Sequence, residues 1–238
     1  MLQKTIGIVL RSIKYSETSV ITTIYTKEFG LRSFIVSGVR RANSKQNASA
    51  YQPMMLLELE IYFRENKNLL RIKGCTHYYL YHSLPFDVVK SAVGIFYVDI
   101  LLRVIKEQEA STSLFNFIQN EFIALDQTNE SIVLSPILFL INLSRYLGFY
   151  PQGTYNEKDR YFDLSEGTFV QTPQRLEYSI GPPLSKIFYN LIQHEATVES
   201  FSYNDRKELL HSLLNYYSFH NADIRNLHSL HVLEMIFK

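Results

Sequence analysis

The sequence predicts a multidomain α+β protein, in which an N-terminal five-stranded β-barrel is followed by an α-helical domain with a small β-hairpin insertion. Two observations predict this. Apolar residues alternate with a period of two as far as about residue 82, and after Pro85 they recur with the period of a helix. The chain has 238 residues, of which 46% are hydrophobic and 20% charged, and this length suits one large or two small domains. We therefore expect domains at residues 1–82 and 83–238.

Five short strands are expected in the first domain. In the clearest, residues 55–64, the odd-numbered residues are all apolar, and the even-numbered ones from residue 58 are glutamate, tyrosine or arginine. This pattern gives the strand one dry and one wet face. The other strands are expected at residues 6–11, 20–25, 31–39 and 69–79. Such a set of short strands fits a small closed barrel, because closure removes exposed sheet edges.

The segment between the third and fourth strands, residues 40–50, differs in composition from its neighbours. It is polar, rich in small residues and without an apolar period, which is typical of a mobile loop. Its cations are Arg40, Arg41 and Lys45. A cationic loop adds nothing to a hydrophobic core, so we expect these three side chains to bind an anionic partner.

Helices account for most of the second domain. We expect them at about residues 89–104, 113–124, 132–147, 182–194, 204–219 and 227–236. The third is apolar nearly all round, so it should lie at the centre of the helical domain, and Gly148 should end it. Residues 152–174 interrupt the helices, and the segment 161–170 within them is expected to form the small hairpin.

Charge divides the chain at about the same place as the periodicity. Residues 1–82 contain 12 basic and 5 acidic residues, whereas residues 83–238 contain 12 basic and 18 acidic residues, so net charges of +7 and −6 combine to the overall +1. This asymmetry indicates that the first domain meets a polyanion and that the second does not. The alternative is a chance distribution of charge over two ordinary domains.

Motifs for chemistry are largely absent. The sequence has no phosphate-loop, dinucleotide-binding, nucleophile-elbow or zinc-protease motif. Three weaker arrangements are the pair Cys75 and His77 on one strand face, the pair His228 and His231 with Glu234 nearby, and the carboxylates of Glu58 and Glu60. A cysteine in a barrel wall and solvated polar side chains explain them more simply, so we do not expect an enzyme. The single cysteine also excludes a disulfide framework and fits a reducing cytosol.

Binding of nucleic acid has more support in the basic half of the chain. Single strands are held by cations that neutralise phosphates and by rings that stack on bases, each stack contributing about 1–3 kcal/mol. We expect Arg11, Arg71 and Lys73 on polar strand faces and Arg32 off the core face. The candidate binding residues are Arg11, Arg32, Arg40, Arg41, Lys45, Arg71, Lys73, Tyr25 and Tyr62. For each tyrosine the alternative is an ordinary strand former.

Several short segments carry a family resemblance. In the first domain they are GIVLR at residues 7–11, YSETS at 15–19, YTKEFG at 25–30, VSGVRR at 36–41 and YQP at 51–53. In the second domain they are YLGFYP at 146–151, FDLSEGTFV at 162–170 and LHSL at 227–230. Each segment alone is a weak signature, but together their order and spacing resemble those of the bacterial RecO recombination mediators over almost the whole chain.

The resemblance implies an OB-fold at residues 1–82 and a helical C-terminal domain. It implies binding of single- and double-stranded DNA and annealing of complementary strands, including strands coated with single-strand-binding protein (SSB). It also implies cooperation with RecR in loading the RecA recombinase, and hence a cytoplasmic, nucleoid-associated protein. A membrane is not an expected partner, since the longest apolar stretch, residues 132–143, falls short of the about 20 residues that a span needs. The runner-up is an OB-fold RNA-binding module with a helical protein-interaction domain, because a barrel alone does not distinguish RNA from DNA.

Two expectations concern the second domain. Many relatives carry four zinc-ligating cysteines in the segment that matches residues 148–180, where this sequence has neither Cys nor His. The hairpin is therefore expected to be a zinc-ribbon remnant without zinc, held by its own aromatic residues. The family likeness also points to the acidic C-terminal tail of SSB as a ligand of this domain, with candidate cations Arg103, Lys106, Arg145, Arg175 and Lys186.

Overall fold

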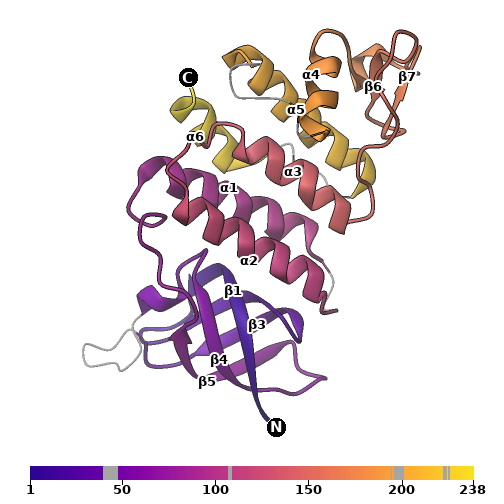
Figure 1. The fold of residues 1–238 in the computed structure, drawn as a ribbon. Coiled ribbons are helices and arrows are strands. Elements are labelled where there is room, and N and C mark those ends of the chain that lie inside the picture. The colour runs from indigo at the N-terminus through magenta and orange to yellow at the C-terminus, as the bar shows by residue number, and fades with distance from the viewer. Residues whose placement is uncertain (40–47, 107–108, 194, 196–200, 222–223, 225) are drawn as a thin grey trace. The chain divides into compact units, whose positions relative to one another are not determined.

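The computed structural model describes residues 1–39, 48–106, 109–193, 195, 201–221, 224 and 226–238 of the chain. It consists of two compact units, Met1–Thr128 and Asn129–Lys238 (Figure 1). The first unit contains the barrel and the first two helices, so it extends beyond the expected domain boundary at residue 82. That boundary stays a prediction.

The first unit contains the predicted five-stranded barrel. Its strands are β1 (Leu2–Lys14), β2 (Val20–Thr26), β3 (Gly30–Val36), β4 (Leu56–Tyr62) and β5 (Leu69–His77). They close in the order β1-β2-β3-β5-β4, with β3 and β5 parallel and the other pairs antiparallel. The OB-fold that the resemblance implied is therefore confirmed.

Strand β1 is longer than predicted because it pairs with two neighbouring strands. Its first half pairs with β4 and its second half with β2, with a bulge between Val9 and Arg11 that interrupts the alternation. Gly7 lies where the strand passes from one partner to the other. A Cβ atom there would lie 2.5 Å from Cγ2 of Ile24 and 2.9 Å from Cδ1 of Leu59, so the close approach of these strands requires glycine.

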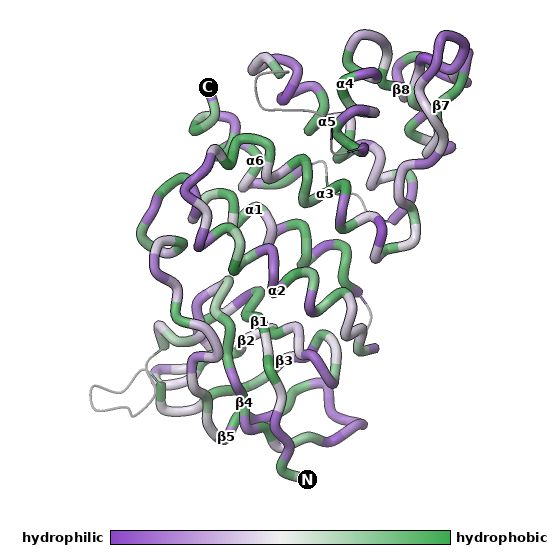
Figure 2. Tube along the Cα trace, in the orientation of Figure 1, coloured by the Kyte–Doolittle hydropathy of each residue, from purple (hydrophilic) through white to green (hydrophobic). Residues whose placement is uncertain are grey.

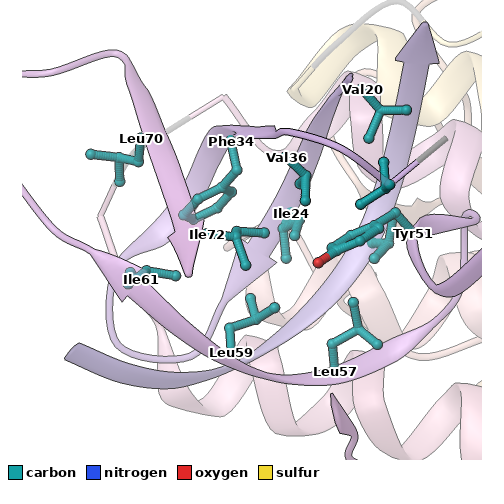
Figure 3. Packing of buried hydrophobic residues seen from close by; sticks show 12 residues of the cluster. Val20, Ile24, Phe34, Val36, Tyr51, Leu57, Leu59, Ile61, Leu70 and Ile72 are labelled. Carbon is teal, nitrogen blue, oxygen red and sulfur yellow. The ribbon is translucent and has the colours of Figure 1, made fainter. Parts of the chain in front are cut away.

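The interior of the barrel is filled by alternate side chains of the strands (Figure 3). On β4, Leu57, Leu59 and Ile61 are buried, which confirms the period of two that the sequence shows. Tyr51, from the short 3₁₀ helix η1 (Ala48–Tyr51), also lies in this cluster. Strand β3 ends at Val36, three residues earlier than predicted, although Val39 remains in the core.

Two helices complete the first unit, α1 (Val88–Val104) and α2 (Thr112–Gln127). The buried carboxylate of Asp126 at the end of α2 accepts hydrogen bonds from three backbone N–H groups of the segment that leaves the barrel, those of His82, Ser83 and Leu84. The Nζ atom of Lys90 donates to the carbonyl oxygen of Asp126 at 2.8 Å. These bonds explain why the first compact unit includes both helices.

The second unit contains the remaining helices and a small sheet. The helices are α3 (Ser135–Tyr146), α4 (Leu184–Ile192), α5 (Tyr203–His220) and α6 (His228–Ile236). The apolar run of α3 is visible in Figure 2, and the helix begins at Ser135 rather than at the predicted residue 132 because Pro136 occupies its first turn. Among the described residues, no helix combines the length and apolar character that crossing a membrane requires.

The predicted hairpin is present as β6 (Tyr161–Asp163) and β7 (Thr168–Val170). A third strand, β8 (Ser179–Ile180), pairs with the other side of β6. Sequence periodicity cannot detect a strand of two residues, so this addition was not predicted.

Candidate nucleic-acid interface

A groove of about 680 Å³ runs along the end of β4, the β4–β5 loop and the start of β5. We call it the β4–β5 groove. The side chains that give it chemical character are those of Tyr62, Arg64, Lys67, Arg71 and Lys73, all of them exposed. A ring among four cations is the combination that single-stranded nucleic acid needs, since cations neutralise phosphates and rings stack on bases.

Strand alternation explains why Tyr62 and Arg71 point outward. Their neighbours Ile61 and Ile72 are 0% and 6% exposed in the barrel core, so the next residue on each strand faces solvent. The register of β4 and β5 places Tyr62 directly opposite Arg71. Opposite residues have Cβ atoms about 4.5–5.5 Å apart, so the ring and the guanidinium can contact one nucleotide together.

Lys73 reaches the groove through an irregularity in the same pair of strands. Glu60 pairs with Gly74 and Ile61 with Ile72, so Lys73 is the extra residue of a bulge. Its Nζ atom lies 3.0 Å from Oε2 of Glu60, on the outer face of β4. The charge that Lys73 brings to the groove is therefore partly neutralised.

The predicted residue Arg11 lies on the same outer face of the barrel, across β2 and β3 from the groove. The strand registers define two neighbouring rows, one of Arg11, Thr23, Ser33 and Leu69, and one of Ile13, Ile21, Ile35 and Arg71. Arg11 is exposed at one end of its row, and Leu69 of the groove stands at the other. OB-folds bind oligonucleotides on this face and on the loops β1–β2 and β4–β5, so Arg11 and the groove belong to one candidate surface.

The prediction that Tyr25 binds nucleic acid is wrong, because its side chain is buried at 1% exposure. Its ring lies 6.0 Å, centroid to centroid, from that of Phe115 on α2, and its hydroxyl donates to the carbonyl oxygen of Ser111 at 3.5 Å. The outer face of β2 is covered by α2 at this point. No base can stack on the ring, so Tyr25 is a packing residue.

Arg32 also differs from its prediction. It pairs with the core residue Ile24 and shares its face of β3 with Phe34, so it lies on the core side of the strand. Its side chain is half-buried, and Nε donates to the carbonyl oxygen of Phe29 at 2.9 Å. A long arginine can occupy a core-side position at the end of a barrel because its stem is apolar and its head reaches a polar group.

Two cations of the groove were not among the predicted binding residues, and three predicted cations lie outside the part of the chain that the structure describes. Arg64 was placed on the wet face of the predicted strand 55–64 and Lys67 in the turn that follows it, and neither was taken as a binding residue, although cations in the β4–β5 loop of an OB-fold are a usable signal. Arg40, Arg41 and Lys45 lie outside the residues that the structure describes.

The possible thiol nucleophile has the wrong environment. Burial raises the pKa of the Cys75 thiol, which outweighs a hydrogen bond with the Tyr51 hydroxyl that lowers it. A nucleophilic cysteine needs the opposite shift. Cys75 packs against the barrel core, and His77 is exposed at the end of β5.

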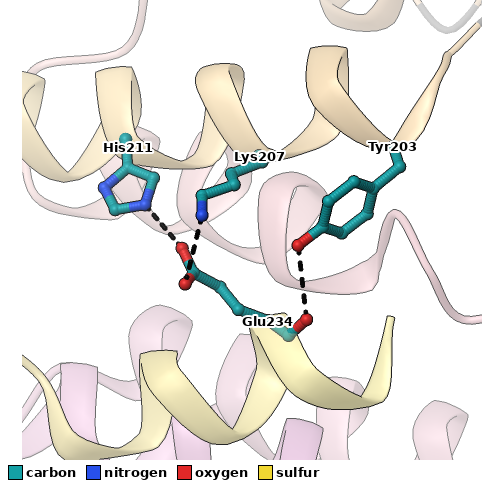
Figure 4. A network of polar contacts seen from close by, with 4 residues as sticks. All are labelled: Tyr203, Lys207, His211 and Glu234. Atoms are coloured by element: carbon teal, nitrogen blue, oxygen red, sulfur yellow. Dashed lines mark hydrogen bonds and ion pairs between the residues drawn. The ribbon is translucent and has the colours of Figure 1, made fainter. Parts of the chain in front are cut away.

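The possible metal site near the C-terminus is not assembled. Glu234 of α6 contacts two residues of α5 instead: its Oε1 lies 2.7 Å from Nε2 of His211 and its Oε2 lies 3.4 Å from Nζ of Lys207 (Figure 4). Burial alone would raise the pKa of the Glu234 carboxyl, but these two partners hold it below its ordinary value. Within the described part of the chain, no three His, Cys, Asp or Glu side chains are grouped so that they could hold a metal ion.

The small sheet of the second unit is organised by a buried carboxylate and by rings. The carboxylate of Asp163, 2% exposed, accepts from the N–H and hydroxyl of Ser165 at 2.9 and 2.6 Å, from the N–H of Glu166 at 3.1 Å, and from the N–H of Gln174 at 3.2 Å. The ring of Phe162 lies 5.1 Å from that of Phe169 and 5.0 Å from that of Phe188. These contacts can hold the hairpin and the loop after it without a metal.

We therefore expect the purified protein to contain less than stoichiometric zinc and to melt at the same temperature with and without EDTA. The reason is that residues 148–180 contain no thiolate or imidazole, the ligands that structural zinc prefers. Elemental analysis and thermal melts check this. One zinc ion per chain, or a melting temperature lowered by the chelator, would contradict it.

The five cations proposed for an acidic tail are divided between the two compact units. Arg103 and Lys106 belong to the first unit. In the second unit, the guanidinium of Arg145 lies 4.2 Å from the centre of the Tyr150 ring, and that of Arg175 lies 5.8 Å from the centre of the Tyr178 ring. Lys186 lines a different hollow, with Tyr155 and Arg160.

Comparison with known proteins agrees with the division into a barrel and a helical part. Residues 1–81 match the family described as recombination protein O N terminal, and residues 85–230 match recombination protein O C terminal. A DNA repair protein RecO of Bacteroides fragilis is 34% identical over 241 residues, and one of Phocaeicola vulgatus is 32% identical over 240 residues, each match covering 100% of both chains. A RecO protein of Flavobacterium psychrophilum is 31% identical over 238 residues, 98% of both chains. The chain therefore belongs to the RecO family of DNA repair proteins.

Proposed function

We propose that the protein binds single- and double-stranded DNA and anneals complementary strands, and that with RecR it helps to load RecA onto SSB-coated single strands. The observation that carries this proposal is the β4–β5 groove, in which Tyr62 stands opposite Arg71 beside Arg64 and Lys67. The strand registers link the groove residue Leu69, through Ser33 and Thr23, to the exposed cation Arg11.

Annealing has a simple physical basis on such a surface. Two complementary strands repel each other as polyanions, and cations that neutralise phosphates of both strands lower this barrier. The contacts must also release the duplex. Arginine and lysine side chains directed at the backbone read no base edge, so they act on any sequence and are weakened by salt.

The proposed role is one of binding and not of bond chemistry. The raised pKa of Cys75 supports this, because the thiol is not activated as a nucleophile. The proposed partners are DNA, RecR, the acidic tail of SSB and, indirectly, RecA. A protein with these partners would act in the cytoplasm at the nucleoid.

The test is an annealing assay with complementary oligonucleotides, with and without SSB. Quenching of a fluorophore reports the formation of the duplex. The protein is expected to accelerate annealing in both conditions, and non-complementary strands serve as the control. No acceleration would contradict the proposal. Preferential binding of an RNA strand over a DNA strand of the same sequence would favour the RNA-binding alternative.

A further inference from the structure

An acidic side chain stands among the cations at the edge of the β4–β5 groove. Glu60 lies on the outer face of β4, two residues before Tyr62, and its Oε2 atom is 3.0 Å from Nζ of the groove residue Lys73. On its other side, the β1–β4 register places the exposed Lys4 directly opposite Glu60. Glu60 thus has a lysine on each neighbouring strand, and its carboxylate is paired with Lys73.

The fold has little need of this ion pair. The side chains of Lys73 and Glu60 are 47% and 37% exposed, and a pair so open to water is screened and contributes little to stability. The contact instead changes the charge that the groove offers to a ligand. A carboxylate and a phosphate compete for the same ammonium group, because each supplies anionic oxygens that accept its hydrogen bonds.

We infer that Glu60 is an internal competitor for the DNA backbone, which occupies Lys73 and thereby removes one phosphate contact from the groove. This inference rests on the proposed function. A strand that enters the groove must replace the carboxylate of Glu60 with one of its own phosphates. The exchange weakens binding and helps the annealed product to leave.

The same strand provides a matched control. Glu58 is exposed on the same face of β4, but its cross-strand neighbours are Ile6 and Thr76, neither of them a cation. Glu58→Gln and Glu60→Gln therefore change the net charge equally, and only the second releases a lysine of the groove. A third variant, Glu60→Asp, keeps the charge beside Lys73.

The test measures the affinity of the full chain for a single-stranded oligonucleotide over a range of salt concentrations. Glu60→Gln is expected to bind on the order of fivefold more tightly at 0.1 M salt, and to steepen the slope of log affinity against log salt by about 0.7, the value for one further phosphate. It should also retain more duplex after annealing. Glu58→Gln should change these quantities much less, and Glu60→Asp should stay close to the parent.

Arg71→Gln separates failure of the inference from failure of the proposed function. If Arg71→Gln weakens binding but Glu60→Gln behaves like Glu58→Gln, the groove binds DNA and the inference about Glu60 is wrong. If neither Arg71→Gln nor Glu60→Gln differs from the parent, or the parent binds no DNA, the assignment of the groove fails and the inference fails with it. Equal melting temperatures of all variants exclude an effect through folding.

Discussion

Replacing Arg64, Lys67 and Arg71 together with alanine is expected to weaken binding of single-stranded DNA about 100-fold at 0.1 M salt. All three side chains are exposed and line the β4–β5 groove. Each phosphate that a cation neutralises adds about −0.7 to the slope of log affinity against log salt. With roughly four to six phosphates neutralised, we expect a slope of roughly −3 to −4 for the parent, flattened by about 2 in the variant. Filter binding or fluorescence anisotropy over a salt series measures both quantities.

The control for this variant has the same loss of charge on the other compact unit. Lys158, Arg160 and Lys186 are exposed there, and their triple alanine variant should bind DNA like the parent. Stability should hardly change in either variant, since surface substitutions are usually within about 0.5 kcal/mol. A groove variant that binds like the parent would place the DNA elsewhere. The triple alanine variant of Arg40, Arg41 and Lys45 would then be the next candidate.

Asp126→Ala is expected to destabilise the first compact unit by about 3–5 kcal/mol, because it leaves buried donors without acceptors. The carboxylate is 3% exposed and accepts from the N–H groups of His82, Ser83 and Leu84 at 3.1, 2.8 and 2.7 Å. Those residues lie more than 40 positions away along the chain, so the loss weakens the link between the end of α2 and the segment that leaves the barrel. Urea unfolding monitored through hydrogen exchange of β1–β5 and α2 measures the free energy of unfolding of this unit by itself.

Asp87→Ala is the matched control for this variant. Its carboxylate also accepts two backbone N–H bonds, those of Val89 and Lys90, but at an exposed helix N-cap. The cost should be near 1 kcal/mol, since water can replace the lost acceptor. Equal destabilisation by the two substitutions would contradict the buried role of Asp126.

The effect of Asp126 should also depend on pH. Burial by itself would raise the pKa of its carboxyl, but the hydrogen bonds from the backbone of residues 82–84 and from Tyr79 hold it below the ordinary value. A depressed pKa contributes stability above the unfolded-state value of about 3.9, and that contribution is lost as the pH falls through the lower, folded-state value. The difference between the parent and Asp126→Ala should therefore shrink in acid, below about pH 4.

Local pattern was sufficient for most of the elements and for part of the candidate site. The period of two in residues 55–64 identified the inner face of β4, and with it the outward position of Tyr62. The same alternation placed Arg71 outside the barrel. The helices were predictable for a similar reason, since their apolar residues recur with the period of a helix or, in α3, cover nearly the whole helix, and Pro136 shifted only the start of α3.

Other features depended on contacts between distant parts of the chain. Alternation correctly places Tyr25 outside the barrel wall, but it cannot show that α2 covers that place. The side of β3 on which Arg32 lies follows from the register of β2 and β3. The ion pair of Lys73 with Glu60 depends on a bulge that no periodicity reveals.

The sequence by itself determined the family, the barrel followed by helices, and the inner face of the most regular strand, β4, because these depend on the order of polar and apolar residues within a few positions. Only the tertiary structure decided which outward side chains remain accessible and which charges are already paired. Both depend on residues brought together from separate strands and helices, as at Tyr25 and at Glu60. A period of two reports the side of a strand on which a residue lies, but burial and charge are set by whatever packs against that side.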